Sequence, residues 1–198
     1  MRVSVKSNID EVTKWTTNVQ RKQIPFATSS AINKTLFQLR KEMMKQTVKK
    51  LDRPTPFTQK GFLVQTAKKT KLKGMLFIKQ QVEEYLQYQI DGGIRSNGKN
   101  IPIPYKPNAR LNKYGNIIGK RTGLIKKNTQ FFGTVKGIDG VWERQKQDNR
   151  LKLIIGFTKT AAYEPKFPFY VIADKFVAAN FDKNFAEKFA QALRSAKW

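Results

Sequence analysis

The chain contains neither cysteine nor histidine. Without cysteine there can be no disulfide framework, no thiolate metal site and no cysteine nucleophile. Without histidine the chain lacks the commonest general base and a principal zinc ligand, and it cannot form a Ser-His or Cys-His pair. These absences exclude most familiar catalytic centres, so we expect a protein that is not an enzyme and holds no metal and no cofactor.

Acidic residues are scarce. Asp and Glu number 14 against 39 Lys and Arg in 198 residues, which gives a formal net charge of +25. A chain with this charge repels itself and needs an anionic neighbour, which can be a nucleic acid, an anionic membrane or an acidic protein surface.

Long hydrophobic runs are also missing. No segment approaches 18 consecutive apolar residues, and the first ten residues do not resemble a signal peptide. We therefore expect a soluble protein made in the cytoplasm. The apolar content of 39% is sufficient for a folded protein, and we expect residues 1–198 to form a single structural domain.

The longest periodic run in the chain predicts a helix from Pro25 to about Leu51, because proline is tolerated at a first helical position. One apolar row along it consists of Ile32, Leu36, Leu39 and Met43, and a second row consists of Phe37, Met44, Val48 and Leu51. Such a helix would be about 40 Å long. Pro54 and Pro56 force their predecessors into extended geometry and end it.

The remaining elements follow from periodicity and from turn residues. We predict a strand at 1–5, a helix from Asn8 that either breaks at 21–23 or continues with a kink, a hairpin of 61–67 and 74–78, a helix at 80–90, a hairpin of 130–136 and 141–144 around an Asp139-Gly140 turn, a strand at 151–157 and a helix at 168–196. This order predicts an α+β fold, with long N-terminal and C-terminal amphipathic helices packed on a small antiparallel sheet.

Between residues 92 and 127 the periodicity fails, and prolines, glycines and asparagines predict a long irregular arm or insertion. The arm is basic, because no acidic residue occurs between Asp91 and Asp139. Its basic residues include Arg110, Lys113, Lys120, Arg121, Lys126 and Lys127. A second basic cluster, Lys68, Lys69, Lys71 and Lys73, lies in the loop of the first hairpin. That loop is either a solvated turn or a contact to phosphate or to an acidic partner.

A search for catalytic motifs finds none. A nuclease would need a metal-binding carboxylate pair followed by a lysine, and Asp139, Glu143 and Lys146 have the wrong spacing for it. The lysines and arginines instead suit sequence-independent phosphate binding, and nearby aromatic residues, Tyr105, Tyr114, Phe131 and Phe132, either stack on single strands or belong to a core.

The long helix also resembles a known family. The Ala31-Ile32-Asn33-Lys34-Thr35 step, the corner from Asp52 to Thr58, the Asp91-Gly92-Gly93 step and the Phe167-Pro168-Phe169 entry to the last helix resemble phage and prophage minor tail protein Z and related tail-completion proteins. The resemblance implies a non-enzymatic virion protein of the neck or tail that joins head to tail.

The resemblance further implies a homo-oligomeric ring around the DNA passage. Its partners would be the portal or adaptor and tail proteins of the same virion and packaged DNA bound without sequence specificity, with no membrane partner. Ile32, Leu36, Leu39 and Met43 would make the subunit contacts, and the two basic clusters would face DNA or partner proteins. The alternative hypothesis, from another class, is a sequence-independent nucleic-acid-binding protein for genome packaging or compaction.

Overall fold

A computed structural model describes residues 14–17, 19–96, 98, 100–118 and 128–195. They form an α+β fold with long N-terminal and C-terminal helices and small antiparallel sheets, which confirms the predicted class. The sequence predicts one structural domain, but the chain divides into two compact units. Unit 1 takes its described residues from Met1–Gln46, Gln59–Val82 and Pro168–Trp198, and unit 2 takes its own from Thr47–Thr58 and Glu83–Phe167.

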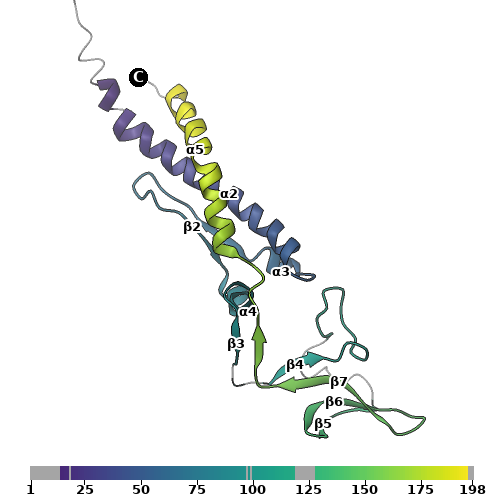
Figure 1. The fold of residues 1–198 in the computed structure, drawn as a ribbon. Coiled ribbons are helices and arrows are strands. Elements are labelled where there is room, and N and C mark those ends of the chain that lie inside the picture. The colour runs from purple at the N-terminus through teal and green to yellow at the C-terminus, as the bar shows by residue number, and fades with distance from the viewer. Residues whose placement is uncertain (1–13, 18, 97, 99, 119–127, 196–198) are drawn as a thin grey trace, which may run out of the picture. The chain divides into compact units, whose positions relative to one another are not determined.

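Unit 1 is built on two long helices that lie side by side, α2 (Ile24–Lys50) and α5 (Phe169–Ser195) (Figure 1). Both begin and end within two residues of their predicted limits. A π-helical segment, η1 (Val19–Gln23), runs directly into α2, so the helix does not break at the predicted 21–23. Pro25 has no N–H to donate, which disturbs the regular hydrogen bonding at this junction. The predicted strand at 1–5 and the helix start at Asn8 lie outside the described residues.

The predicted first hairpin is confirmed as strands β1 (Phe62–Gln65) and β2 (Met75–Ile78). The Asn33 side chain of α2 bonds the chain just after β1. Asn33 Nδ2 donates to the Ala67 carbonyl at 3.0 Å, and Asn33 Oδ1 accepts from the Ala67 amide at 2.7 Å. Gly74 lies so close to α2 that a Cβ there would come within 2.6 Å of Leu36 and 3.0 Å of Ile32. The hairpin therefore packs tightly on one side of the helix.

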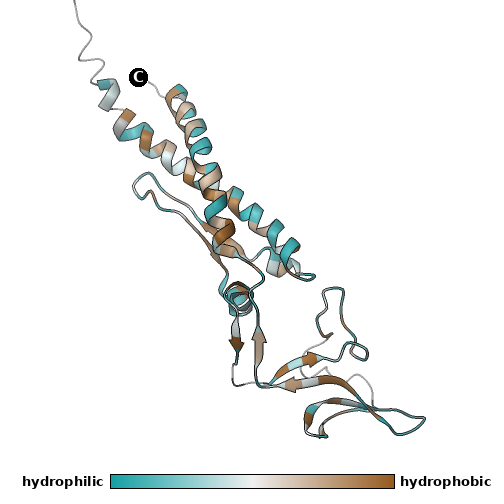
Figure 2. Cartoon of the chain, viewed as in Figure 1, coloured by the Kyte–Doolittle hydropathy of each residue, from teal (hydrophilic) through white to brown (hydrophobic). Residues whose placement is uncertain are grey.

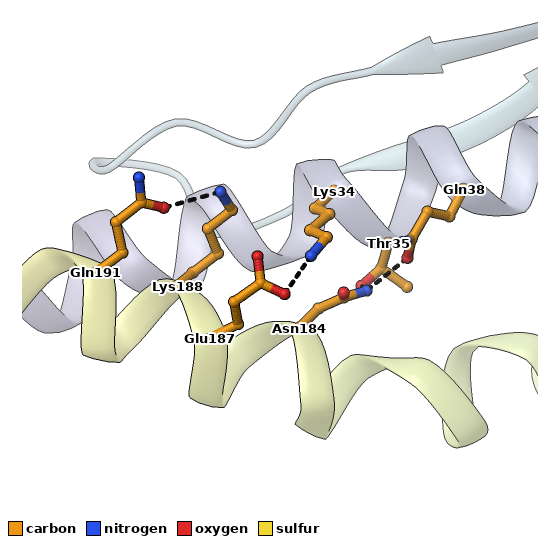
Figure 3. A network of polar contacts seen from close by, with 7 residues as sticks. All are labelled: Lys34, Thr35, Gln38, Asn184, Glu187, Lys188 and Gln191. Atoms are coloured by element: carbon orange, nitrogen blue, oxygen red, sulfur yellow. Dashed lines mark hydrogen bonds and ion pairs between the residues drawn. The ribbon is translucent and has the colours of Figure 1, made fainter.

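A polar network joins α2 to α5 (Figure 3). The buried Asn184 amide donates to Thr35 Oγ1 at 2.9 Å and to Gln38 Oε1 at 2.7 Å. One turn further along α5, Glu187 forms an ion pair with Lys34. Because a buried amide must find partners, these contacts set the register of the two helices.

The core of unit 1 includes residues of the apolar row that was predicted to make subunit contacts. Leu39 and Met43 are buried within the unit itself, and Ile32 and Leu36 are half-buried against the hairpin. Leu39 and Met43 therefore pack inside the chain, whereas Ile32 and Leu36 each keep part of their surface exposed. The predicted second row differs, because Phe37 in it remains exposed.

Unit 2 contains two sheets and most of the helix α4 (Gln80–Ile90), from Glu83 onward. The short helix α3 (Pro56–Gln59) belongs to unit 2 up to Thr58, and unit 1 resumes along the chain at Gln59. Gly92 and Gly93 follow α4 with positive φ angles, as the helix stop predicts. Strand β3 (Gly93–Arg95) pairs with β8 (Ala161–Tyr163). The larger antiparallel sheet has the order β4-β7-β6-β5, with β4 at Ile101–Pro104, β5 at Gln130–Val135, β6 at Ile138–Arg144 and β7 at Leu151–Thr158.

The arm predicted at 92–127 is more ordered than expected. Strands β3 and β4 lie within it, and Pro102 and Pro104 are tolerated because β4 is an edge strand. Residues 105–118 fold onto the sheet: the Tyr105 amide donates to Ile154 O at 3.0 Å, and Asn108 Nδ2 donates to Leu153 O at 2.7 Å. Residues 119–127 lie outside the described part.

The turn of the second hairpin is displaced from the predicted Asp139-Gly140. It falls on Lys136 and Gly137, whose φ angles are +52° and +77°. Two positive φ angles are typical of a type I′ turn, which suits the twist of a hairpin. Asp139 instead lies in β6, where its carboxylate accepts a hydrogen bond from Thr134 on β5.

Candidate anion-binding sites

The loop of the first hairpin brings its four lysines to one tip of unit 1. The backbones of Lys68 and Lys71 exchange two hydrogen bonds of 3.0 Å, so the chain turns tightly at Lys69 and Thr70. Lys68, Lys69, Lys71 and Lys73 are all exposed. The structure thus gathers the first predicted basic cluster on a short, well-defined turn.

A cleft of about 470 Å³ lies beside this turn. Lys69 Nζ lies 4.8 Å from the centre of the Phe26 ring, within the range of a cation–π interaction. The residues that line the cleft are Arg21, Lys22, Gln23, Pro25, Phe26, Lys69, Thr70 and Ser195. This lining combines three cations with two hydroxyl groups and no carboxylate, a set suited to phosphate oxygens. We call it the tip cleft.

Few acidic groups oppose these cations. In the described part of unit 1 the acidic residues are Glu42, Asp174, Asp182 and Glu187. Glu187 is already paired: the hydrogen bond from Lys34, and then its charge, hold the pKa of the Glu187 carboxyl below its ordinary value of 4.5. Unit 1 is therefore strongly basic over its described surface.

The second predicted cluster is described only in part. Arg110 and Lys113 are exposed on the loop that packs against the large sheet, and Lys113 Nζ lies 5.1 Å from the centre of the Tyr114 ring. The Asn112 side chain shapes this loop by accepting hydrogen bonds from the Tyr114 and Asn116 amides. Lys120, Arg121, Lys126 and Lys127 lie outside the described residues.

Unit 2 has a larger cleft, of about 600 Å³, at the corner where α2 ends. We call it the corner cleft. It is lined by Leu51, Asp52, Arg53, Pro54, Thr55, Thr58, Tyr85, Leu86, Gln89, Tyr114, Asn116 and Lys166. Linked hydroxyl groups lie along it, with Thr58 Oγ1 3.0 Å from Thr55 Oγ1 and 2.9 Å from the Tyr85 hydroxyl.

Sequence reasoning missed both clefts as sites. Arg21 and Lys22 are separated from Lys69 by more than 40 residues, and no local pattern connects them. The corner cleft had a signal in the Asp52-Arg53-Pro54-Thr55 corner, which marks a sharp change of direction at a helix end. Its other walls, from α4 and from Tyr114 and Lys166, come together only in the folded unit.

Among the described residues, no group of three or more acidic side chains could hold a metal ion. The carboxylates of Asp139 and Glu143 each take part in a cross-strand hydrogen bond, with Thr134 and Gln130 respectively. In the same part of the chain, no helix is both long and apolar enough to span a membrane.

Comparisons of this chain with protein-family models, with curated proteins and with solved structures give no match.

Proposed function

We propose that this protein is a non-enzymatic structural protein of a bacteriophage neck or tail, which completes the tail or joins head to tail as a ring around the DNA passage. The resemblance of its long helix and proline corner to tail-completion proteins supports the phage assignment. One structural observation supports assembly into a ring: both long helices of unit 1 have large apolar side chains that remain exposed.

These apolar side chains lie on several elements of unit 1. Phe37 on α2 is 46% exposed, and Tyr170 and Val171 at the start of α5 are 62% and 51% exposed. Met75 and Phe77 are exposed on one face of β2. Figure 2 shows hydrophobic stretches that alternate with hydrophilic ones along both helices. Covering the exposed half of such a side chain is worth about 1 kcal/mol, which favours contacts with neighbouring subunits.

The charge sets a condition on this assembly. Subunits that each carry +25 repel one another, so a ring forms favourably only where anions neutralise it. Packaged DNA in the bore and acidic surfaces of portal, adaptor or tail proteins would supply that charge. In this proposal the tip cleft and the hairpin lysines face DNA phosphates, and the exposed helix faces meet neighbouring copies.

The test is electron microscopy of particles produced when a virus lacks this gene. The proposal expects DNA-filled heads apart from tails, or tails of irregular length, with wild-type particles restored when the gene is supplied from a plasmid. Phe37→Glu on the plasmid should fail to restore them while the purified variant keeps its helical circular dichroism. Normal particles without the gene would refute the proposal.

The tip cleft also favours the second candidate, a sequence-independent nucleic-acid-binding protein for packaging or compaction. This candidate expects the isolated chain to bind duplex DNA tightly, with affinity that falls steeply as salt rises. Lys69→Gln should reduce the slope of log affinity against log salt by about 0.9, the loss of one phosphate contact. Lys175→Gln, which removes an exposed lysine of α5, is the matched control and should leave the slope unchanged. Weak binding by the isolated chain would exclude this candidate.

A further inference from the structure

The corner cleft is organised around one cation, Arg53. Its φ angle of +46° lies in the left-handed region and not in the extended geometry predicted before Pro54, and this region is strained for a residue with a side chain and usual for glycine. The guanidinium packs on Gly115, where a Cβ would come within 2.9 Å of Nη2. The Arg53 side chain nevertheless remains 52% exposed. A glycine would suit this backbone better, so the strain points to a use for the guanidinium.

The Arg53 guanidinium already pairs with the Asp52 carboxylate, but both contacts are long. Arg53 Nε lies 3.1 Å from Asp52 Oδ1, and Nη2 lies 3.2 Å from Asp52 Oδ2. Both contacts are longer than the roughly 2.7–2.9 Å of strong charge-assisted hydrogen bonds. The partners are neighbours in the sequence and exposed to solvent, which makes this a weak ion pair. A carboxylate from another molecule, with shorter contacts, could replace Asp52 at the same guanidinium N–H groups.

Other cations surround this position. The hydrogen bond from Arg53, and then its charge, hold the pKa of the Asp52 carboxyl below its ordinary value of 3.8, and Lys106 and Lys166 lower this pKa further. The Lys166 amide donates to Gln89 O at 2.8 Å, which fixes Lys166 beside α4. The cleft lining thus holds two cations, Arg53 and Lys166, and one carboxylate, Asp52, which leaves positive charge for an anionic ligand.

We propose that the corner cleft binds a carboxylate from an acidic polypeptide segment of a partner protein. Before this segment binds, Asp52 occupies the Nε and Nη2 donors of Arg53. A polypeptide fits better than a nucleic acid because the side chains of Thr55, Gln89 and Asn116 offer donors and acceptors to peptide groups beside the apolar Leu51 and Leu86.

The test uses the isolated full chain, so it does not depend on the proposed virion role. Binding is measured by fluorescence anisotropy with a labelled peptide in which glutamates alternate with alanine and leucine. The same peptide with glutamines in place of glutamates, and a labelled single-stranded DNA oligonucleotide, serve as comparison probes. Because a chain of +25 attracts any polyanion, each variant needs a control with the same change of charge.

Arg53→Gly removes the guanidinium and suits the positive φ, so this variant is expected to fold. Its matched control is Lys136→Gly, which removes one cation at a φ of +52° in the β5–β6 turn. Asp52→Asn frees Arg53, and its matched control is Asp148→Asn, which frees Arg150 from a similar near-neighbour ion pair.

We expect Arg53→Gly to weaken binding of the glutamate peptide about tenfold and Lys136→Gly to weaken it less than about twofold. Asp52→Asn should strengthen binding about threefold, a gain that misfolding cannot imitate, and Asp148→Asn should change it little. Equal losses from Arg53→Gly and Lys136→Gly would overturn the proposal. An equal dependence of DNA binding on Arg53 would assign the cleft to phosphate and overturn it as well.

Discussion

The buried amide of Asn184 should be worth more to the fold than any surface charge of unit 1. The side chain is 4% exposed and donates two hydrogen bonds across the helix pair, and its partner Thr35 is 2% exposed. Asn184→Leu keeps the number and branching of the side-chain heavy atoms but removes both donors. Each lost hydrogen bond costs about 1 kcal/mol, and leaving buried acceptors without a donor adds to this. We therefore expect a loss of about 2–3 kcal/mol in the free energy of unfolding.

A double-mutant cycle isolates this contact from other effects. Thr35→Val alone removes the hydroxyl and leaves the Asn184 amide with one partner fewer. Combined with Asn184→Leu, it replaces a polar pair by apolar groups of similar shape, which is far less costly than leaving one partner alone. The double variant should therefore be more stable, by about 1 kcal/mol, than the sum of the single losses predicts.

The assay is urea unfolding followed by circular dichroism at the helical signal, with melting temperatures as a second measure. A chain of this length should lose about 5–10 °C in Asn184→Leu. Asn180→Leu is the control, because Asn180 donates to Phe176 O of its own helix, and its loss should stay below about 1 kcal/mol. Equal losses at positions 180 and 184, or an additive cycle, would show that the network does not hold α2 and α5 together.

Three further predictions concern single positions. Gly140→Ala should destabilise unit 2 by about 1–3 kcal/mol in urea unfolding, because its Cβ would lie 2.3 Å from the Ile155 carbonyl oxygen, whereas Gly133→Ala meets only the edge of the Phe131 ring at 3.3 Å and should be mild. The folded-state pKa of Glu187 is lowered, so its stabilising contribution is complete above pH 4.5 and is lost as pH falls below that value; melting temperatures from pH 6 to pH 3 should decline less steeply in Glu187→Gln. Lys136→Asn places Asn-Gly in the type I′ turn and should raise the melting temperature slightly, whereas a decrease would contradict the turn assignment.

The helices were predictable because their signals are local. Pro25, Pro54, Gly92 and Pro168 mark their ends, and the apolar rows of α2 and α5 repeat at helical spacing. Strand β4 was not predictable in this way. Its alternating prolines are typical of a loop, and its partner β7 lies about 50 residues later in the chain, so only tertiary pairing makes it a strand. The turn at Lys136 and Gly137 was missed for a similar reason. The pairing of Phe131 with Trp142 and of Phe132 with Val141 sets the register and outweighs the Asp-Gly signal.

The candidate sites, too, were predictable only where their residues are neighbours in the sequence. Charge density along the chain was enough to single out the hairpin lysines, because they are neighbours in the sequence. The tip cleft needs the approach of Arg21 and Lys22 to Lys69, and the corner cleft needs the approach of Arg53 to Gly115 and Lys166. Side chains brought together from distant segments leave no periodic trace, so sequence reasoning could find the charges but not the cavities between them.

The residues that carry the family resemblance have a structural explanation of their own. Within the Ala31 to Thr35 step, Ala31 is buried, Asn33 holds the hairpin, Lys34 pairs with Glu187 and Thr35 accepts from Asn184. Each of these contacts serves the packing of unit 1, so packing accounts for the residues of this step. The Asp52 to Thr55 corner differs, because Arg53 is strained and half exposed, and its guanidinium has only a weak partner. Packing does not explain Arg53, so we expect substitutions at this corner to affect the proposed binding of an acidic segment before they affect stability.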